Sequence, residues 1–449
     1  MKPDHLTKID DQVWPHFNCA SFDQDKVVSF GNFQYTIYWA YDQTLVLVRR
    51  NLQTQDVQSL RFSGYHLSIN PRDGHRNTVL GISPHDGRLH LSWDHHNNDL
   101  RYTKSIAGFL THPPKEISWR DFEPAQPLTN DAPQRVTYPR FFNDHQDNLF
   151  FIYRTGSSGS GDAVFSKYNA QSATWTITSK CLFSKEGTYA PWENSTSRNA
   201  YLHDVLFDQT GRLHITWGYR EAGKSWASNH DLHYAFSNDE GRTWHNNAGT
   251  QNADTTNNDP ITLDDPGIVV KPIPTYSWLM NQCGMTLDQN NQPHVATFHM
   301  AEPFIPEELK HDPPENVLDR LAIHHYWRDP NGTWHNSGPI LHVPEKNERV
   351  KRPIIVTDAH NNIVIYNTSS KGHQCHVAFA KDGYQTRATF PLTDTTYNIT
   401  DASKPDRRLL KNKGILSFTV DPSGNSEQRA FALVDFSLNR ILEEAQTHL

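Results

Sequence analysis

One pattern recurs along the chain and limits what it can fold into: an apolar run, a turn rich in Asp, Asn and Gly, and a second apolar run. This pattern is typical of a β-hairpin. The strongest copy spans Asp73 to His96, and a weaker one begins at Ala40. Five more copies have their turns at 143–150, 208–214, 288–294, 358–364 and 421–426, which makes seven copies in all.

After each hairpin come one or two further strand-like runs, and repeats of four short antiparallel strands indicate propeller blades. We therefore expect an all-β fold, a seven-bladed β-propeller of four-stranded antiparallel blades. Short helices are expected over Ile305–Leu321 and from Leu438 onward. We expect one domain over residues 1–449, with approximate blades at 33–62, 75–120, 136–180, 201–245, 281–335, 351–390 and 407–436.

The segment 237–244 reads S-N-D-E-G-R-T-W. It matches the S-x-D-x-G-x-T-W Asp-box, which closes the outer hairpin of sialidase-type blades. The Asp-box is a folding element, so it supports the fold and says little about chemistry.

Composition excludes several classes of function. The formal net charge of -8 argues against nucleic acid as a partner. No apolar run approaches the roughly 18 residues of a membrane span. The first residues lack the apolar stretch of a signal peptide, so we expect a protein that stays in the cell or has lost its signal. The four cysteines lie far apart, which disfavours a disulfide framework or a zinc ribbon. We expect a monomer.

Titratable residues recur at the positions where a propeller places strand ends around its central channel. The open end of the hairpin from Asp73 to His96 brings its flanking histidines together, because antiparallel strands are joined at the opposite end. Later repeats place further polar side chains at the matching positions. The set comprises His75, His95, Tyr138, Arg154, His203, Tyr219, Arg220, Cys283 and His299.

His, Tyr and Arg without a carboxylate pair fit poorly to glycoside hydrolysis, which usually needs two acidic groups. They fit well to β-elimination on a uronic acid. In that reaction a base removes the C5 proton, an acid protonates the leaving oxygen at C4, and cationic groups neutralise the carboxylate.

Four segments, D-G-H-R-N-T, S-W-D-H-H, T-Y-P-R-F and F-I-Y-R-T-G-S, together resemble the seven-bladed β-propeller ulvan lyases and related uronate-specific polysaccharide lyases. The resemblance implies cleavage of ulvan-like rhamnose–uronate glycans to unsaturated uronate ends, with no cofactor in catalysis. It assigns His75 as base, Tyr138 as acid, and Arg154 and His95 as groups that neutralise the carboxylate. The roles of His75 and Tyr138 could reverse with the epimer at C5.

Two further sets are weighed against ordinary structural roles. Substrate contacts are expected from residues that could equally be exposed loop residues, namely His96, Asn98, Tyr219, Arg220 and Lys224. A structural zinc is a further expectation, because the related lyases carry a structural metal. Its ligands would be Cys283, His203 and His299 with a fourth donor, although Cys283 could simply be a buried small apolar residue.

Other interpretations stay open. A propeller glycoside hydrolase could act on rhamnosyl-uronate linkages with one of these histidines. A non-catalytic sugar-binding propeller would stack sugar rings on aromatic residues such as Trp192 and Trp226. A protein-interaction scaffold is hard to reconcile with the His, Tyr and Arg set. Taken singly, His75 could be a turn histidine and Arg154 an ordinary surface ion-pair partner.

Overall fold

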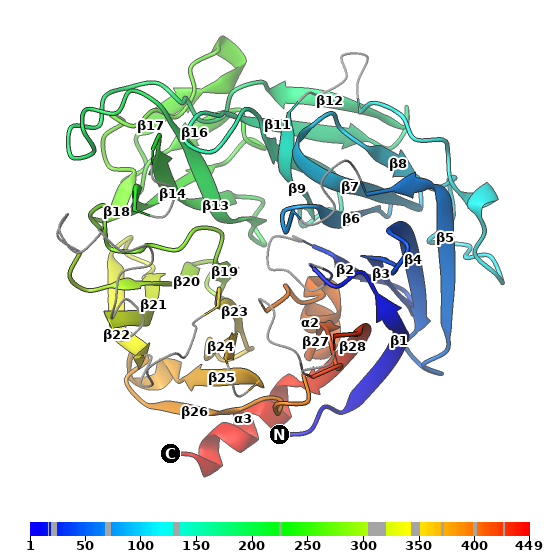
Figure 1. The fold of residues 1–449 in the computed structure, drawn as a ribbon. Coiled ribbons are helices and arrows are strands. Elements are labelled where there is room, and N and C mark those ends of the chain that lie inside the picture. The colour runs from blue at the N-terminus through cyan, green and yellow to red at the C-terminus, as the bar shows by residue number, and fades with distance from the viewer. Residues whose placement is uncertain are drawn as a thin grey trace. The chain divides into compact units, whose positions relative to one another are not determined.

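The regular secondary structure of the computed structural model is almost entirely antiparallel strand (Figure 1). It describes the chain except for residues 17, 19–24, 68–72, 129–134, 224–226, 304–319, 343–350, 370–371, 398–401 and 425–426. Contacts divide the chain into two compact units. Unit 1 comprises Met1–Thr155, Ser166–Ile177 and Leu392–Glu444, and unit 2 comprises Gly156–Phe165, Thr178–Pro391 and Ala445–Leu449. In the described part of the chain, no helix is both long and apolar enough to cross a membrane.

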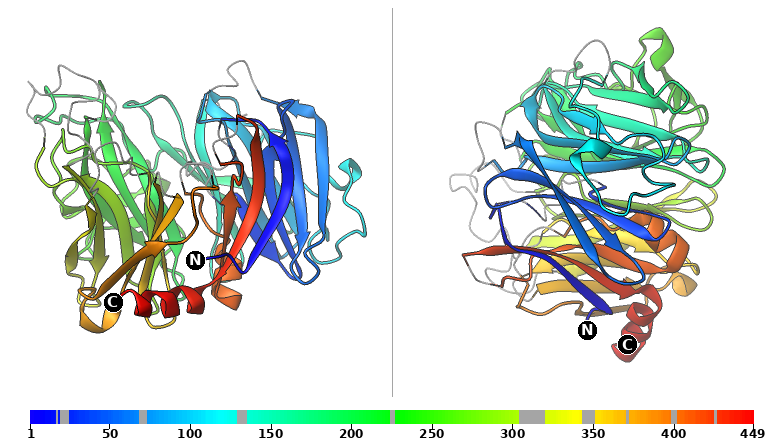
Figure 2. Two further views of the ribbon diagram at one scale, coloured as in Figure 1. Left: turned by 60° about the horizontal axis from the view of Figure 1, so that its bottom comes forward. Right: turned by 90° about the vertical axis from the view of Figure 1, so that its right-hand side faces the viewer.

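Unit 1 begins with two small sheets. The first has the order β2-β3-β4-β5, with strands Val27–Phe30, Phe33–Trp39, Thr44–Asn51 and Val57–His66. The second has the order β1-β28-β27, with strands His5–Val13, Arg429–Ser437 and Ile415–Val420. β1 lies alongside β28 in both views of Figure 2, so the N-terminal strand completes a sheet formed by the C-terminal part of the chain.

A longer sheet contains the predicted hairpin. Its order is β12-β11-β10-β9-β7-β6, with β8 beside β7. The strands are β6 Asn77–Ser83, β7 Arg88–Asn98, β8 Tyr102–Lys104, β9 Val136–Asn143, β10 Leu149–Arg154, β11 Ala163–Asn169 and β12 Thr174–Ser179. β6 and β7 pair antiparallel across the predicted turn, which confirms the hairpin. β7 also pairs with β9 near its end, through His96 with Thr137 and Asn98 with Val136.

Unit 2 contains three further sheets. In one, β13 Arg198–Phe207, β14 Leu213–Glu221, β15 Asn229–Ser237, β16 Thr243–His245 and β17 Gln251–Asp254 follow in order, with β18 Val269–Lys271 on β15. The next has β19 Gly284–Leu287, β20 Pro293–Met300, β21 Leu321–Arg328 and β22 Trp334–His342. The last has β23 Ile354–Thr357, β24 Ile363–Ser369, β25 Gly372–Ala378 and β26 Arg387–Pro391.

The repeated turns share one chemical device. An aspartate at the start of the turn accepts hydrogen bonds from the backbone N–H groups two and four residues later, at 2.7 to 2.9 Å. The carboxylate thus satisfies donors that a tight hairpin leaves unpaired. This occurs at Asp144, Asp208, Asp288 and Asp358. The Asp-box closes in the same way, because Asp239 accepts from the N–H of Thr243 at 2.9 Å while Trp244 is buried.

Some of the many histidines are structural parts of these repeats. Nε2 of His214 lies 3.2 Å from the carboxylate of Asp208, and its Nδ1 lies 2.8 Å from the hydroxyl of Tyr234. His294 is buried at the matching position, 3.6 Å from the carboxylate of Asp288. Histidine content alone therefore does not identify the functional site.

The sheets pack face to face through alternate residues. In β3, Tyr35, Ile37 and Trp39 join a core with residues of β4, β6 and β7. Tyr38, the neighbour on the opposite face, packs against Phe431 of β28 at a ring separation of 4.8 Å. Because successive strand residues point to opposite faces, one strand supplies two cores.

Among the described residues, two α-helices accompany the sheets. α3, Leu438–Thr447, confirms the helix predicted from Leu438. α2, Arg407–Lys413, was not predicted; Asp406 caps it by accepting from two backbone N–H groups, and Gly414 ends it with a φ of 63°. Most of the predicted helix Ile305–Leu321 lies outside the described residues. Short 3-10 helices span Trp119–Asp121, Thr255–Asn257 and Ala380–Asp382.

Candidate active site

One carboxylate holds two histidines together at the open end of the β6–β7 hairpin. Oδ1 of Asp73 lies 2.7 Å from Nδ1 of His75, and Oδ2 lies 2.5 Å from Nδ1 of His96. The two imidazole rings stack, with centroids 4.4 Å apart and planes inclined by 23°. Both rings present Nδ1 to Asp73, so both Nε2 atoms point away from that carboxylate.

A tight turn before β6 and a bulge in β7 produce this arrangement. The backbone N–H of His75 donates to Oδ1 of Asp73 at 3.1 Å, which closes the Asp-Gly-His turn. In the ladder with β6, β7 carries an extra residue, Asp94, whose φ is 63°. Such a bulge interrupts the alternation of side chains. His96 consequently faces Asp73, and His95 does not.

β7 then crosses to β9 and brings two more predicted residues to the histidines. The ring centroids of His75 and Tyr138 are 6.1 Å apart. The guanidinium carbon of Arg154 lies 5.2 Å from the centroid of the Tyr138 ring, and its Nη2 donates to Oδ1 of Asn97 at 3.3 Å. We call the resulting group the imidazole cluster, which comprises Asp73, His75, His96, Tyr138 and Arg154.

The backbone around this cluster is strained. Tyr138 has a φ of 54° although it carries a bulky side chain, and Asn97 has a φ of 58°. The left-handed region costs an L-residue roughly 1–2 kcal/mol. Strain of this kind concentrates at functional sites, where the surrounding structure holds a side chain in a required direction.

The cluster combines an ionised carboxylate with accessible imidazoles. Burial alone would raise the pKa of Asp73, but hydrogen bonds from His96 and His75 outweigh burial and lower the pKa to about 2. Asp73 is therefore ionised at neutral pH. The side chains of His75 and His96 are 39% and 29% exposed, so a ligand can reach both rings.

Two predicted residues beside the cluster serve the fold. His95 is fully buried, and its Nε2 accepts a hydrogen bond from the backbone N–H of Arg101 at 3.1 Å. Burial lowers the pKa of His95 to about 3, so this residue is neutral and does not suit the predicted carboxylate-neutralising role. Oδ1 of Asn98 accepts from the backbone N–H of His96 at 2.7 Å and from Arg76 at 3.3 Å.

The remaining substrate-binding predictions fall in unit 2. Tyr219 is fully buried and therefore is not exposed to a ligand. Arg220 donates to Oδ1 of Asn229 at 2.7 Å and to the hydroxyl of Tyr201 at 3.0 Å, and it lies over the Tyr201 ring. Lys224 lies outside the described residues, as does Trp226. Trp192, considered above for sugar stacking, is buried and donates to a backbone carbonyl.

The predicted zinc ligands do not converge. The backbone N–H of Cys283 donates to Nδ1 of His203 at 3.2 Å. Nδ1 of His299 lies 2.8 Å from the next backbone carbonyl, and its Nε2 lies 2.7 Å from the hydroxyl of Tyr326. Across the described ranges, the one set of three potential metal-ligating residues with ligand atoms within 4.8 Å of one another is Asp73 with its two histidines. Hydrogen bonds account for its short contacts, and zinc at Cys283 stays a prediction.

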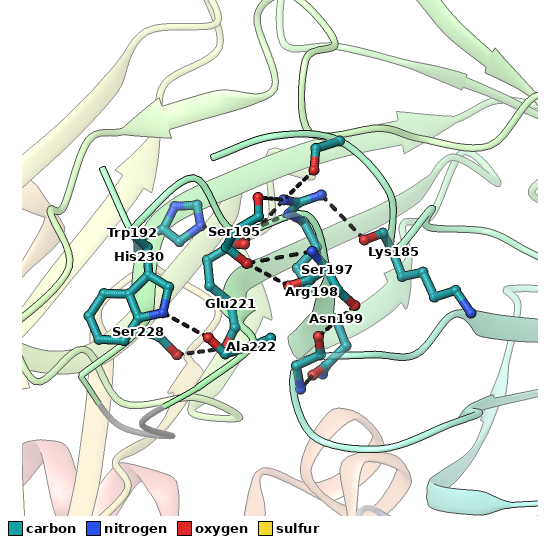
Figure 3. A network of polar contacts seen from close by, with 12 residues as sticks. Lys185, Trp192, Ser195, Ser197, Arg198, Asn199, Glu221, Ala222, Ser228 and His230 are labelled. Carbon is teal, nitrogen blue, oxygen red and sulfur yellow. Dashed lines mark hydrogen bonds and ion pairs between the residues drawn. The ribbon is translucent and has the colours of Figure 1, made fainter. Parts of the chain in front are cut away.

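Figure 3 shows Arg198, Glu221 and His230, which together with Asp231 form a second group that we call the buried network. Nε and Nη2 of Arg198 lie 2.7 and 3.1 Å from the two carboxylate oxygens of Glu221. Nε2 of His230 lies 3.2 Å from Glu221, and its Nδ1 lies 2.9 Å from Asp231. The side chains of Arg198, Glu221 and His230 are fully buried, and Tyr189 stacks on the imidazole at 3.9 Å.

Two residues of this site, Asp73 and Asn97, were not predicted from the sequence. Asp73 had a local signal, because an Asp two residues before a His can close a turn and reach the imidazole. Asn97 had none, since its contact with Arg154 depends on the bulge in β7 and on strand pairing with β9. Sequence alternation alone does not locate a bulge.

A family model described as BNR repeat-containing family member matches residues 33–339. Among curated proteins, the ulvan lyase long isoform of Pseudoalteromonas sp. (strain PLSV) is 24% identical over 296 residues, which cover 57% of this chain and 29% of that protein. The ulvan lyase short isoform of Alteromonas sp. (strain LOR) is 22% identical over 306 residues, covering 57% of this chain and 56% of that protein. The chain therefore spans less than two thirds of either relative.

Two solved structures share the fold. The crystal structure of the polysaccharide lyase Uly1 has a TM-score of 0.70 and 17% identity, and the match covers 98% of this chain and 100% of that chain. A PL25 ulvan lyase bound to -[GlcA(1-4)Rha3S]- has a TM-score of 0.69 and 14% identity, with 99% of each chain covered. At such low identity these matches describe the fold alone.

Proposed function

The chain belongs to the BNR repeat-containing family, and we propose that it is a polysaccharide lyase that cleaves ulvan-like rhamnose–uronate glycans by β-elimination. One observation carries the proposal: a turn, β9 and β10 bring His75, Tyr138 and Arg154 into one cluster, in which His75 is accessible and Arg154 is mostly buried. The names of the curated relatives and of the two solved structures with the same fold agree with it.

His75 is the proposed base. Its Nδ1 donates to Asp73, so the lone pair is on Nε2, which takes the C5 proton. The electrons of the broken C5–H bond form the C4=C5 double bond as the C4–O bond breaks. Tyr138 then donates its phenolic proton to the leaving oxygen. The two roles exchange if the C5 epimer presents its proton from the opposite face.

Arg154 and His96 are the proposed partners of the uronate carboxylate. Loss of the C5 proton places negative charge on this carboxylate, and fixed cationic donors stabilise that charge. Arg154 is held by Asn97 and lies against the Tyr138 ring. His96 takes the part expected of His95, because its ring stacks on His75 while the ring of His95 faces the interior.

We also propose how the observed sheets divide into the blades of a propeller. Six sheets occur among the described residues, and the longest divides at the β7–β9 pairing into two groups, which makes seven. We infer that these seven groups are the blades of a seven-bladed propeller and that residues 1–449 form a single domain.

The decisive experiment is incubation with ulvan, other uronate polymers and their oligosaccharides. A lyase generates the conjugated C4=C5 double bond, so ultraviolet absorbance rises as chains are cut. Reducing ends without this absorbance would instead indicate a glycoside hydrolase. Binding without either signal would indicate a sugar-binding protein. Both outcomes would overturn the proposal.

Hydrolysis has weaker support. It usually requires two carboxyl groups on either side of the scissile bond. The one carboxylate in the imidazole cluster, Asp73, already accepts hydrogen bonds from two histidines. A carboxylate with a pKa of about 2 is also a poor general acid at neutral pH.

A further inference from the structure

Asp73 is the one member of the imidazole cluster that contacts both histidines through hydrogen bonds. Its two oxygens are divided between them, one oxygen to each Nδ1. A third bond, from the backbone N–H of His75, fixes the carboxylate relative to the turn. Asp73 itself is mostly buried, with a side-chain exposure of 13%, whereas the rings that it holds are more exposed.

We propose that Asp73 is the positioning residue of the site: it keeps a proton on Nδ1 of each imidazole and thereby presents both Nε2 atoms to the substrate. This inference rests on the proposed lyase function, because it assigns one task to each ring. A carboxylate that orients a histidine sets its tautomer and raises its basicity. Here a single carboxylate does so for the proposed base and for its cationic neighbour.

The neighbouring carboxylate does not fit this role. Asp94 is fully buried, and its oxygens face arginines: Oδ1 lies 3.6 Å from Nε of Arg76, and Oδ2 lies 2.5 Å from Arg101. Asp94 thus anchors the bulge of β7 through arginines. Asp73 lies farther from Arg76, at 3.6 Å, than from either imidazole.

The two stacked imidazole rings share a single carboxylate. Two imidazolium ions with centroids 4.4 Å apart repel each other, and one carboxylate neutralises one of them. The shared carboxylate and the stacked geometry therefore disfavour two positively charged rings at once. In the described part of the chain, the other charged or titratable groups around the pair include Arg76 on Asp73, Tyr138 beside His75, and Arg154 over the Tyr138 ring.

The test compares wild-type protein with Asp73→Asn. An amide offers one acceptor group and one donor group, so it satisfies only one Nδ1–H. The other ring then loses the hydrogen bond that fixes its orientation. We expect kcat to fall by about 10²-fold with little change in KM. We also expect the acidic limb of the pH profile to move to lower pH, because the imidazolium of the base loses its carboxylate partner. Unchanged kcat and pH profile would overturn the proposal.

A matched control separates positioning from folding. Asp144 is a turn aspartate of the same unit, whose Oδ1 accepts from two backbone N–H groups and which contacts no member of the cluster in any described hydrogen bond. Asp144→Asn should reduce thermal stability and leave the pH profile in place. If both variants lower activity with the same unshifted pH profile, Asp73 is merely structural.

A measurement without substrate keeps this test independent of the proposed function. Long-range ¹⁵N–¹H spectra of histidine-labelled protein report which ring nitrogen carries the proton. Signals are assigned with His75→Gln and His96→Gln. A proton on Nδ1 of both rings that is lost from one ring in Asp73→Asn supports the proposal, and a neutral ring protonated at Nε2 alone in the wild type refutes it. Absence of lyase activity in the wild type would refute the proposed function instead.

Discussion

The imidazole cluster and the buried network contain the same residue types in opposite arrangements. In the imidazole cluster, one carboxylate serves two histidines whose side chains are 39% and 29% exposed. In the buried network, two carboxylates serve His230, which is fully buried and bonded at both ring nitrogens. Both groups would look alike in a list of histidines and acidic residues.

The difference lies in the task that each geometry permits. Burial alone would lower the pKa of His230, but the hydrogen bonds that it donates to Asp231 and Glu221 outweigh burial and raise the pKa. An imidazolium enclosed in this way is a fixed positive charge that stabilises the fold. In the imidazole cluster, both Nε2 atoms point away from the shared carboxylate, so those rings suit proton transfer.

The largest expected effect comes from removing a proton-transfer group of the imidazole cluster. His75→Ala and Tyr138→Phe should each lower kcat by about 10³-fold, because each variant loses a group that exchanges a proton. Circular dichroism should show an unchanged fold. Initial rates of ultraviolet absorbance increase measure the loss, and near-wild-type rates in both variants would contradict the assignment.

The second-largest effect is expected from removing the positive charge of Arg154. Arg154→Met should lower kcat/KM by about 10²-fold to 10³-fold, because the uronate carboxylate loses a cationic donor as charge develops. A uronate methyl ester supplies the matched substrate. Wild type should turn it over poorly, and the variant should lose little further activity on it. A similar loss on both substrates would show that Arg154 does not act on the carboxylate.

Removing a charge from the buried network should lower the stability of the fold. Glu221→Gln leaves Arg198 and His230 without their shared carboxylate, and breaking a buried ion pair costs about 3–5 kcal/mol. Urea denaturation at neutral pH measures this cost. Activity per folded molecule should remain close to that of the wild type below the unfolding transition. A stable variant with reduced kcat would reverse the proposed division between the two groups.

His95 and His96 provide an internal test, since they are adjacent residues with different surroundings. His96→Gln should lower kcat/KM by about 10-fold to 10²-fold with an unchanged melting temperature. His95→Gln should lower the melting temperature with a smaller effect on turnover, because His95 is buried and bonded to Arg101. The opposite pattern would restore the original assignment of His95.

The smallest effect concerns acid stability. Burial lowers the pKa of His95 from 6.5 to about 3 and that of His233 likewise to about 3. Between pH 6.5 and about 3, these histidines bind protons in the unfolded chain but not in the folded chain. The free energy of unfolding therefore falls as the pH decreases below 6.5. Each buried histidine should cost about 1.5 kcal/mol between pH 6.5 and 5. His233→Phe should show a shallower pH dependence in urea titrations, and an equal slope would contradict this account.

The sequence predicted the hairpins well because their causes are local. The turn of Asp86 and Gly87 joins β6 and β7 as expected. Most of the predicted turns also contain an aspartate that pairs with backbone N–H groups a few residues away. Helix α2 was not predicted because it is short, although its capping residues Asp406 and Gly414 can be identified in the sequence.

The site was predicted in part. His75, Tyr138 and Arg154 do come together, which followed from strand ends meeting along one sheet. The sequence assigned a catalytic role to His95, whereas the structure places His96 beside Asp73, because simple alternation along β7 is interrupted at Asp94. Tyr219 was expected at the surface, yet it is buried.

By itself, the sequence determined the strands, their turns and the residue types gathered at one hairpin, because these depend on contacts a few residues apart. The tertiary structure decided which histidine shares Asp73, and which histidine and carboxylate group is accessible or enclosed. Those outcomes depend on a bulge, on the pairing of β7 with β9, and on packing by distant segments. Nonlocal contacts of this kind have no signature in a short stretch of sequence.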